Sequence, residues 1–186
     1  MENKTIRPDL LAKSLKFATK RHKGQFRDGV DPLPYITHPV DVVNILRYEG
    51  SVADPAILAA GFMHDLVEET ETTVEEIEAR FGSRVAGLVS ELTRDEPSDE
   101  VRASLPEVEL WGLRSQLLLD GIARMSRDAQ TVKLADRVSN LRGSKATREG
   151  WKLERYITQS RSILERIARD VCPSLWDLVE RESSAR

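Results

Sequence analysis

Apolar residues recur at intervals of three or four through most of the chain, which is the spacing of helices that bury one face. A first helix is expected to begin around Arg7-Pro8-Asp9, with proline in its first turn and aspartate near the positive end of the helix dipole. It is expected to end at Gly24, since one stripe at intervals of four, three and four residues joins Leu11, Leu15, Ala18 and His22.

Local capping signals place the other helices. Residues 25–38 contain Gly29, Pro32 and Pro34 and are interpreted as a loop, with Pro39 opening the next helix. Asp54-Pro55 begins a helix expected to continue through residues 61–70. Thr73-Val74-Glu75-Glu76 fits a capping box for a helix to about Phe81. Further helices are expected from after Gly82-Ser83 to about Leu92, and at roughly 108–125, 128–142, 149–169 and 173–182.

The pattern lacks strand-like alternation over more than four residues and shows no internal repeat. We therefore predict an all-α fold: a single domain over residues 1–186, with its core in 8–170, built as an irregular bundle of about eight to ten helices. Residues 94–107 contain two prolines and charges of both signs. They are interpreted as a mobile connection.

Composition narrows the class of protein. The chain has 186 residues, 40% apolar and 32% charged, with a net charge of −3. This describes a globular domain, and no overall positive charge favours nucleic acid or an anionic membrane. Cys172 is the only cysteine, so an internal disulfide or a cysteine-rich zinc site is excluded. A polar N-terminus and the lack of a long apolar run predict a cytoplasmic protein, with its oligomeric state left open.

Candidate chemistry begins in the apolar stretch GFMHDLVEET, residues 61–70. His64 and Asp65 interrupt it, and Glu68 and Glu69 follow one turn later. On one continuous helix, at about 100° per residue, these four side chains would fall within a sector of about 140°. We therefore expect them to point into one cavity.

Two further positions extend this set. His38 directly precedes Pro39, and Asp136 interrupts an apolar stripe with Asn140 one turn further on. A buried carboxylate is rare unless it is paired, hydrogen-bonded or metal-bound. Each feature alone has an ordinary explanation: an exposed His-Asp pair, an ion pair of Asp136 with a nearby arginine, or a core role for His22. The candidate arginines are Arg137 and Arg142.

Taken together, His38, His64, Asp65 and Asp136 form a mixed set of imidazole and carboxylate ligands. Such a set suits Mn²⁺, Fe²⁺ or Zn²⁺. Glu68 and Glu69 would then orient or deprotonate a water molecule that the metal activates. The residues therefore favour a metal-dependent hydrolase.

The blocks RHKGQFRDGVDPLPYITHPVDVV, FMHDLVEETETTVEEIEARFG and VKLADRVSNLR resemble a known family in this order. They are similar to the HD-domain metal phosphohydrolases, and within them to the (p)ppGpp hydrolase domain of the RelA/SpoT proteins and the stand-alone small alarmone hydrolases. The similarity runs from about residue 8 to 170. It implies removal of the 3′-pyrophosphate from ppGpp or pppGpp.

The resemblance also implies roles for individual residues. His38, His64, Asp65 and Asp136 would hold one Mn²⁺. Glu68 and Glu69 would work with the nucleophilic water, Arg27 would pack on the guanine base, and Asn140 would lie near the ribose. Because animal relatives can also act on NADPH, another nucleotide is an alternative substrate. A catalytically weak module that senses a nucleotide is a second alternative.

Three positions depart from the family pattern. Glu69 stands where the family has aspartate, and the added methylene displaces the carboxylate by roughly 1 Å. Asp28 stands where a lysine is common, and residues 94–112 do not match. A local basic rim can still attract an anionic substrate, since two clusters flank the ligands: Lys20, Arg21, Lys23 and Arg27, then Arg137, Arg142, Lys145 and Arg148.

Overall fold

The computed structural model describes residues 8–184, so Arg7 of the expected first helix start and the rest of segment 1–7 lie outside the described residues, as do 185–186. Within 8–184 the chain is helical and forms no β-strand; one isolated antiparallel bridge joins Phe26 to Pro34. The predicted all-α fold is therefore confirmed. No helix formed by these residues has the length and apolar character that a membrane crossing requires.

The first half of the chain forms a group of short helices: α1 (Pro8–Arg21), α2 (Thr37–Asn44), a π-helical turn (Ile45–Glu49), α3 (Pro55–Met63), α4 (Leu66–Glu69), α5 (Val74–Phe81) and α6 (Ser83–Leu92). The second half contains α7 (Asp99–Ser104), α8 (Glu107–Arg124), α9 (Arg127–Thr147), α10 (Gly150–Leu164), a 3₁₀ turn (Arg169–Val171) and α11 (Pro173–Ser184), of which α8, α9 and α10 are the longest.

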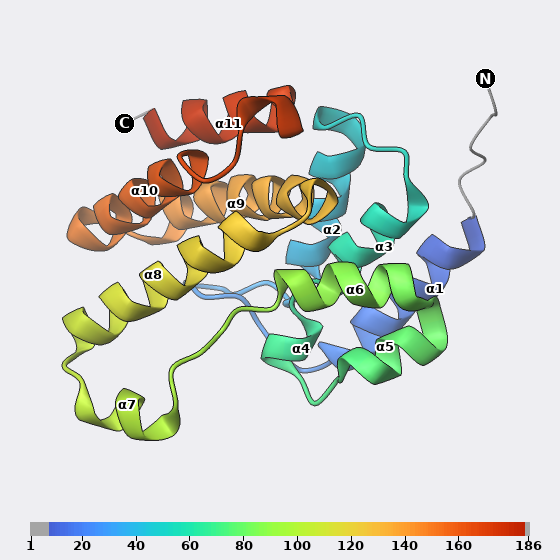
Figure 1. Ribbon diagram of the computed structural model, residues 1–186, viewed down its shortest axis with the longest axis horizontal. Helices are drawn as coiled ribbons and strands as arrows, with labels where there is room; N and C mark the ends of the chain where they lie inside the picture. The colour runs from blue at the N-terminus through green and yellow to red at the C-terminus, as the bar shows by residue number, and fades with distance from the viewer. Residues whose placement is uncertain (1–7, 185–186) are drawn as a thin grey trace.

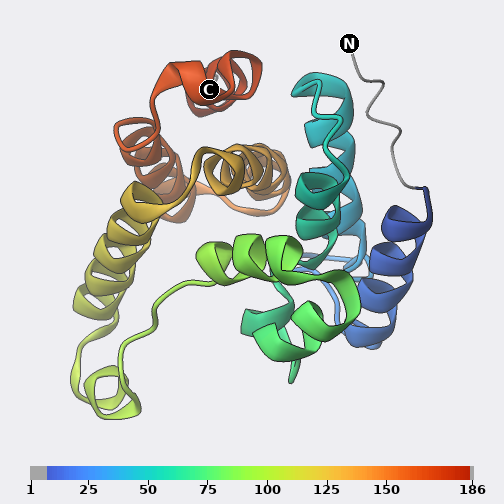
Figure 2. The same cartoon turned by 45° about the vertical axis from the view of Figure 1, so that its right-hand side comes forward.

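Helix α9 is the central element of the bundle. It packs against α2, α3 and α6 on one side and against α10 and α11 on the other (Figure 1). Turning the molecule shows α1 and α6 beside α3 and α5 against α6, while α8 and α10 lie beyond α9 (Figure 2). Almost every residue of α9 between Ala129 and Ser139 is buried. Any polar side chain in that stretch must therefore find a partner inside the protein.

The expected capping signals operate at two helix starts. The side chain of Asp54 accepts a hydrogen bond from the backbone N–H of Ala56 and caps α3, with Pro55 in the first turn. Thr73 accepts from the backbone N–H of Glu76 and caps α5. Gly82 separates α5 from α6 at φ 90°, a left-handed conformation that glycine adopts without a Cβ clash.

The expectation of one continuous helix through residues 61–70 is wrong. Helix α3 ends at Met63 and α4 begins at Leu66, with His64 and Asp65 between them. The Nδ1 atom of His64 lies 2.9 Å from the carbonyl oxygen of Gly61, an acceptor that a continuing helix would use for its own backbone. This interruption turns the two side chains differently from the positions on a straight helix.

The segment expected to be a mobile connection, residues 94–107, contains α7 and is attached to the body of the protein through charged side chains. Arg94 pairs with Glu68, Asp95 with Arg124 at 2.9 Å, and Glu96 with Arg114 at 2.8 Å. The side chain of Ser98 caps α7, which has no buried residue of its own. Its mobility stays a prediction.

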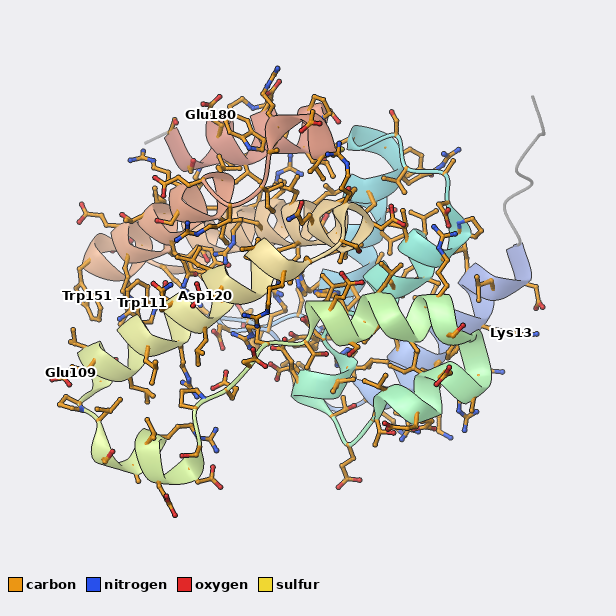
Figure 3. All side chains as sticks on the ribbon, viewed as in Figure 1. Lys13, Glu109, Trp111, Asp120, Trp151 and Glu180 are labelled. Carbon is orange, nitrogen blue, oxygen red and sulfur yellow. The ribbon has the colours of Figure 1, made fainter. Side chains whose placement is uncertain are left out.

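The outer ends of α8 and α10 are joined by an aromatic cluster. The guanidinium of Arg155 lies 4.5 Å from the ring centre of Trp111 on α8 and 4.9 Å from that of Trp151 on α10. Figure 3 shows the two indoles close together at one edge of the molecule, while Glu109 and Asp120 project from α8. Cation–π contacts therefore connect these helices where the apolar core does not extend.

Close packing of α2 against α3 gives a test of the fold around the first two histidines. A Cβ atom added at Gly61 would lie 2.9 Å from Leu46 Cδ1 and 3.0 Å from Val43 Cγ2, both in buried side chains. We expect Gly61→Ala to lower the free energy of unfolding by about 1–3 kcal/mol through overpacking, measured by urea denaturation.

The matched control is Gly87→Ala in α6, where an added Cβ meets nothing within 4 Å. Because alanine is the better helix former, this variant should gain up to about 1 kcal/mol. Equal effects of the two substitutions would contradict the packing described for α2 and α3.

Candidate active site

Three parts of the fold bring two histidines and two aspartates together. Helix α2 carries His38, the junction between α3 and α4 carries His64 and Asp65, and α9 carries Asp136. The Nε2 atom of His38 lies 3.2 Å from Asp136 Oδ1 and 3.5 Å from Asp65 Oδ2. The Nε2 atom of His64 lies 3.0 Å from Asp65 Oδ1 and 3.6 Å from Asp136 Oδ1. All four side chains thus face one point.

Hydrogen bonds at the outer side of each imidazole set its orientation. The Nδ1 atom of His64 faces the carbonyl oxygen of Gly61, which can only accept, so Nδ1 carries a hydrogen and Nε2 faces the carboxylates. The Nδ1 atom of His38 lies 3.0 Å from the hydroxyl oxygen of Ser139 on α9. This arrangement directs the Nε2 atoms of both rings toward the carboxylates, as metal-binding histidines require.

The donor atoms fit a shared cation better than they fit one another. Atoms that each lie about 2.1 Å from one ion are about 3.0–3.4 Å apart at octahedral or tetrahedral angles, close to the separations above. His64 Nε2 is buried and makes no hydrogen bond within the described part of the chain, although Asp65 Oδ1 is near. His38, His64 and Asp65 form a group that can hold a metal ion, and Asp136 adjoins it.

Electrostatics at the cluster favour a positive charge. Burial alone would lower the pKa of His64, but the carboxylates of Asp65 and Asp136 outweigh burial and raise it to about 10. Burial would raise the pKa of Asp65, yet the neighbouring imidazoles hold it well below its usual value. The two ionised carboxylates therefore stabilise either a proton on His64 or a metal cation in its place.

Asp136 has partners on every side. Lys133, one turn earlier on α9 and also buried, donates to Asp136 Oδ2 at 3.0 Å, and Asn140 donates to Oδ1 at 2.5 Å. Burial would raise the pKa of Asp136, but Lys133 and the two imidazoles hold it far below its usual value. Neither arginine considered as its ion-pair partner has that role: Arg137 bonds Gln159, and Arg142 pairs with Glu49 and Glu182.

Tyr35 supports the cluster from the loop before α2. Its hydroxyl donates to Asp65 Oδ2 at 2.7 Å, and its ring stacks on the imidazole of His22 with 4.6 Å between centroids. Burial and the Asp65 carboxylate raise the pKa of Tyr35, which keeps its hydroxyl protonated as a donor. His22 is a buried core histidine, as its place on the apolar stripe of α1 indicates, and it lies directly behind this tyrosine.

The two glutamates of α4 point to different surroundings. Glu68 accepts hydrogen bonds from the backbone N–H and the side-chain Nε of Arg94, at 2.9 and 2.6 Å. Glu69 lines the cavity beside His38. Partial burial, then the carboxylates of Asp65 and Glu68, raise the pKa of Glu69, while Arg94 opposes them. Both glutamates were expected to point into the cavity, but only Glu69 lines it.

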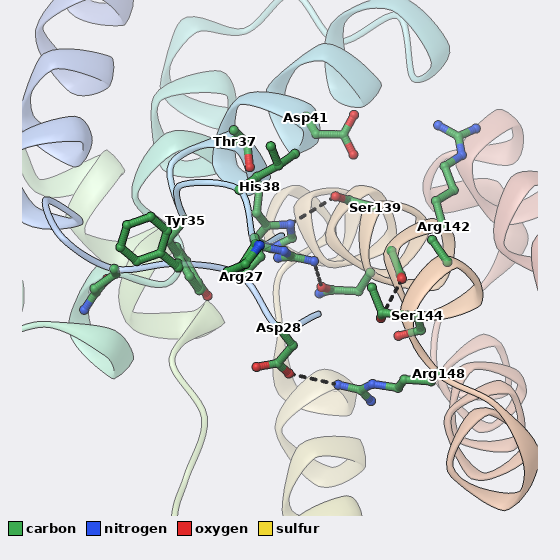
Figure 4. Close-up of a pocket in the computed structure, with 18 of the residues that line it drawn as sticks. Arg27, Asp28, Tyr35, Thr37, His38, Asp41, Ser139, Arg142, Ser144 and Arg148 are labelled. Atoms are coloured by element: carbon green, nitrogen blue, oxygen red, sulfur yellow. Dashed lines mark hydrogen bonds and ion pairs between the residues drawn. The ribbon is translucent and has the colours of Figure 1, made fainter. Parts of the chain in front are cut away.

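A cavity of about 910 Å³ opens above His38. The loop after α1 forms one wall and the second half of α9 forms the other, as Figure 4 shows with Arg27 and Tyr35 facing Ser139 and Ser144. Arg27 donates to Asn140 Oδ1 at 3.2 Å. A Cβ at Gly143 would lie 3.2 Å from Arg27 Nη2, so glycine leaves room for this arginine across the cavity.

Only part of the expected basic rim surrounds the cavity. Of the expected residues, Arg27, Arg142 and Arg148 line the cavity, and Arg94, which was not expected, lines it as well. Arg21 instead pairs with Glu76, and Lys145 pairs with Glu182. Asp28 lies 3.6 Å from Arg148 at the mouth and is largely exposed (Figure 4). The Asp28 carboxylate therefore partly neutralises Arg148, one of the arginines that line the cavity.

Sequence reasoning did not identify Tyr35, Ser139, Gln25 or Arg94 as members of this site. Ser139 was detectable, since it follows Asp136 by three residues and shares its helix face. Tyr35 precedes His38 by three residues, but in a loop whose path the sequence does not define. Arg94 had no local signal, because its partner Glu68 lies 26 residues earlier in the chain.

Comparison with known proteins agrees with this arrangement. Residues 14–171 match the HD domain family. The chain is 41% identical over 147 residues to guanosine-3′,5′-bis(diphosphate) 3′-pyrophosphohydrolase MESH1 of Xenopus tropicalis, covering 78% of this chain and 76% of the relative. The Homo sapiens protein of the same name is 38% identical over 146 residues, covering 78% and 75%.

One solved structure similar to this chain is that of a protein described as a metazoan ortholog of SpoT that hydrolyzes ppGpp. It superposes with a TM-score of 0.79 at 29% sequence identity and covers 93% of each chain. The family match spans all four clustered side chains and most of the helical bundle. The chain belongs to the HD domain family.

Proposed function

We propose that this chain is a metal-dependent phosphohydrolase that removes the 3′-pyrophosphate from ppGpp or pppGpp. The observation that carries the proposal is the convergence of His38, His64, Asp65 and Asp136 beside a cavity lined by arginines. The relatives named as guanosine-3′,5′-bis(diphosphate) 3′-pyrophosphohydrolases support the choice of substrate.

The four clustered side chains would hold one divalent cation. Two imidazoles and two carboxylates suit Mn²⁺, and Fe²⁺ or Zn²⁺ are compatible with the same ligands. Such an ion supplies Lewis-acid polarisation of a phosphoryl oxygen and lowers the pKa of a water molecule.

Glu69 is the best placed general base. It lines the cavity, and partial burial together with Asp65 and Glu68 raises its pKa, which makes its carboxylate a stronger base than an ordinary glutamate. Glu68 acts one step further away, since its carboxylate holds Arg94 at the cavity wall. The proposal therefore assigns proton transfer to Glu69 and placement of a cation to Glu68.

The nucleotide would lie between the loop wall and α9. Arg27 would pack on the guanine base and Asn140 would contact the ribose, and these two side chains already bond each other across the cavity. Arg94, Arg142 and Arg148 also line the cavity, and their guanidinium groups would bind phosphate oxygens by exchanging the carboxylates with which they pair.

A second candidate keeps the chemistry and changes the substrate to another nucleotide, such as NADPH. Asp28 favours it, because a carboxylate paired with Arg148 at the mouth opposes the most highly charged ligands. A third candidate is a sensor that binds a nucleotide without turnover. The following experiment separates the three.

Purified protein loaded with Mn²⁺ is incubated with ppGpp, NADPH and a nucleotide panel, and released pyrophosphate and phosphate are measured. We expect pyrophosphate from ppGpp. Asp65→Ala and Asp136→Ala should each abolish metal binding and turnover, whereas Asp120→Ala on the exposed face of α8 should not. Phosphate release from other nucleotides alone would move the proposal to the second candidate; full activity of either ligand variant would overturn the ligand assignment.

Tyr35→Phe removes the hydroxyl that donates to Asp65 while keeping the ring. Because a hydrogen bond to a ligating carboxylate holds it in the orientation that binds the metal, we expect Mn²⁺ affinity to fall about 10- to 100-fold. Titration calorimetry with Mn²⁺ measures this directly. An unchanged dissociation constant would show that the hydroxyl does not position Asp65.

The pH profile tests the role of Glu69. A general base must be ionised, so kcat falls as the pH drops below the pKa of the base; this fall is the acid limb of the profile. Because the pKa of Glu69 is raised, the acid limb should lie at a higher pH than it would for an ordinary glutamate. Arg94 lowers the pKa of Glu69, so Arg94→Gln should move the limb to higher pH. Glu69→Gln should lower kcat by about 10²-fold or more and remove the limb. A limb that persists in Glu69→Gln belongs to another group.

A further inference from the structure

We propose that His22 and Gln25 are positioning residues for the reaction, acting through the backbone of Glu69. A chain of two hydrogen bonds runs from the His22 imidazole through the Gln25 amide to the carbonyl of Glu69. The inference rests on the proposed role of Glu69 as general base. It assigns a function to a buried histidine and a glutamine that neither bind the metal nor carry the proton.

Helix α4 needs such a support because it is a single turn of four residues. The last carbonyls of a helix lack partners within it. Thr70 bonds the carbonyl of Leu66 through both its hydroxyl and its backbone N–H, whereas the carbonyl of Glu69 is bonded by Gln25. The Nε2 atom of Gln25 donates to the carbonyl oxygen of Glu69 at 2.6 Å, directly before Thr70 turns the chain into an extended conformation. Gln25 thus fixes the residue whose side chain faces the cavity.

His22 determines which way the Gln25 amide points. Since Gln25 Nε2 donates to Glu69, its Oε1 must accept, and His22 Nδ1 lies 2.6 Å from that oxygen. His22 therefore carries its hydrogen on Nδ1. The ring is almost fully buried and is held flat by its stacking on Tyr35. A rigid imidazole behind the amide prevents Gln25 from rotating away from Glu69.

The same two residues connect both parts of the reaction centre. Tyr35, against which His22 stacks, donates to the proposed metal ligand Asp65, while Gln25 holds the proposed base. The distance between the proposed ligand Asp65 and the proposed base Glu69 therefore depends on the packed unit of His22, Gln25 and Tyr35 beside the end of α1. Displacing a reacting group by about 1 Å can cost about 100-fold in rate, so loss of this unit should reduce kcat.

An ordinary helix-end contact would behave differently, and the chain offers a matched example. Gln130 also donates its side-chain amide to a backbone carbonyl, that of Ile122 near the end of α8, at 3.1 Å. It lies outside the cavity lining. Gln130→Leu therefore removes the same type of bond from a helix end that has no part in the reaction.

The test compares Gln25→Leu with Gln130→Leu in the Mn²⁺-loaded enzyme. We expect Gln25→Leu to lower kcat for ppGpp about 10- to 100-fold with metal content unchanged, and Gln130→Leu to lower stability alone. In a Glu69→Gln background, Gln25→Leu should add no further loss, because it acts through Glu69. Additive losses, or equal kcat in Gln25→Leu and wild type, would overturn the proposal.

Two substitutions of His22 separate packing from hydrogen bonding. His22→Phe keeps a ring against Tyr35 but loses the donor, whereas His22→Asn keeps a donor near the position of Nδ1 but loses the ring. We expect kcat per folded molecule to fall in His22→Phe and to be largely retained in His22→Asn. The reverse order would show that His22 acts by packing only.

Amide hydrogen exchange gives a readout independent of turnover. Residues 66–70 should exchange faster in Gln25→Leu and His22→Phe, and at the wild-type rate in Gln130→Leu. Unchanged exchange in α4 would sink the inference even if ppGpp is hydrolysed. A wild-type enzyme that hydrolyses no nucleotide, yet shows this local change, would instead refute the proposed function and leave the support of α4 in place.

Discussion

The structure depends on the burial of two carboxylates beside two imidazoles at the centre of a helical bundle. Asp65 and Asp136 lie within 3.0–3.6 Å of the Nε2 atoms of His38 and His64. Two ionised carboxylates that are largely shielded from water, Asp136 buried and Asp65 partly buried, are costly unless positive charge lies between them. The two carboxylates raise the pKa of His64 because they stabilise a positive charge beside them, and a divalent cation can supply that charge in place of the proton.

The surrounding fold holds these groups against their mutual repulsion. Helix α9 is long and buried, so Asp136 cannot turn toward water, and Lys133 and Asn140 occupy its remaining positions. The adjacent residues His64 and Asp65 lie at the junction between α3 and α4, and both face the same point. Of the two glutamates of α4, Glu69 lines the cavity and Glu68 bonds Arg94, so the proposed proton transfer belongs to Glu69.

The sequence was sufficient for most of the helices and for the identity of the clustered side chains, because periodicity and buried polar residues are local signals. Asp54 and Thr73, for example, were predicted to cap the starts of two helices, and the structure contains both capping hydrogen bonds. The sequence missed α7 and the break between α3 and α4. It was insufficient where geometry depends on distant partners. Residue spacing does not predict that Glu68 bonds Arg94 while Glu69 lines the cavity, nor that Asp28 pairs with Arg148. Arg94 and Arg148 both come from other parts of the chain.

The central claim is that the cluster is a single metal centre, and anomalous diffraction from crystals grown with Mn²⁺ tests it most directly. The account predicts one strong anomalous peak per chain, bounded by His38, His64, Asp65 and Asp136 at about 2.0–2.2 Å from the donor atoms. No peak among these four side chains, or a peak elsewhere in the cavity, would contradict it.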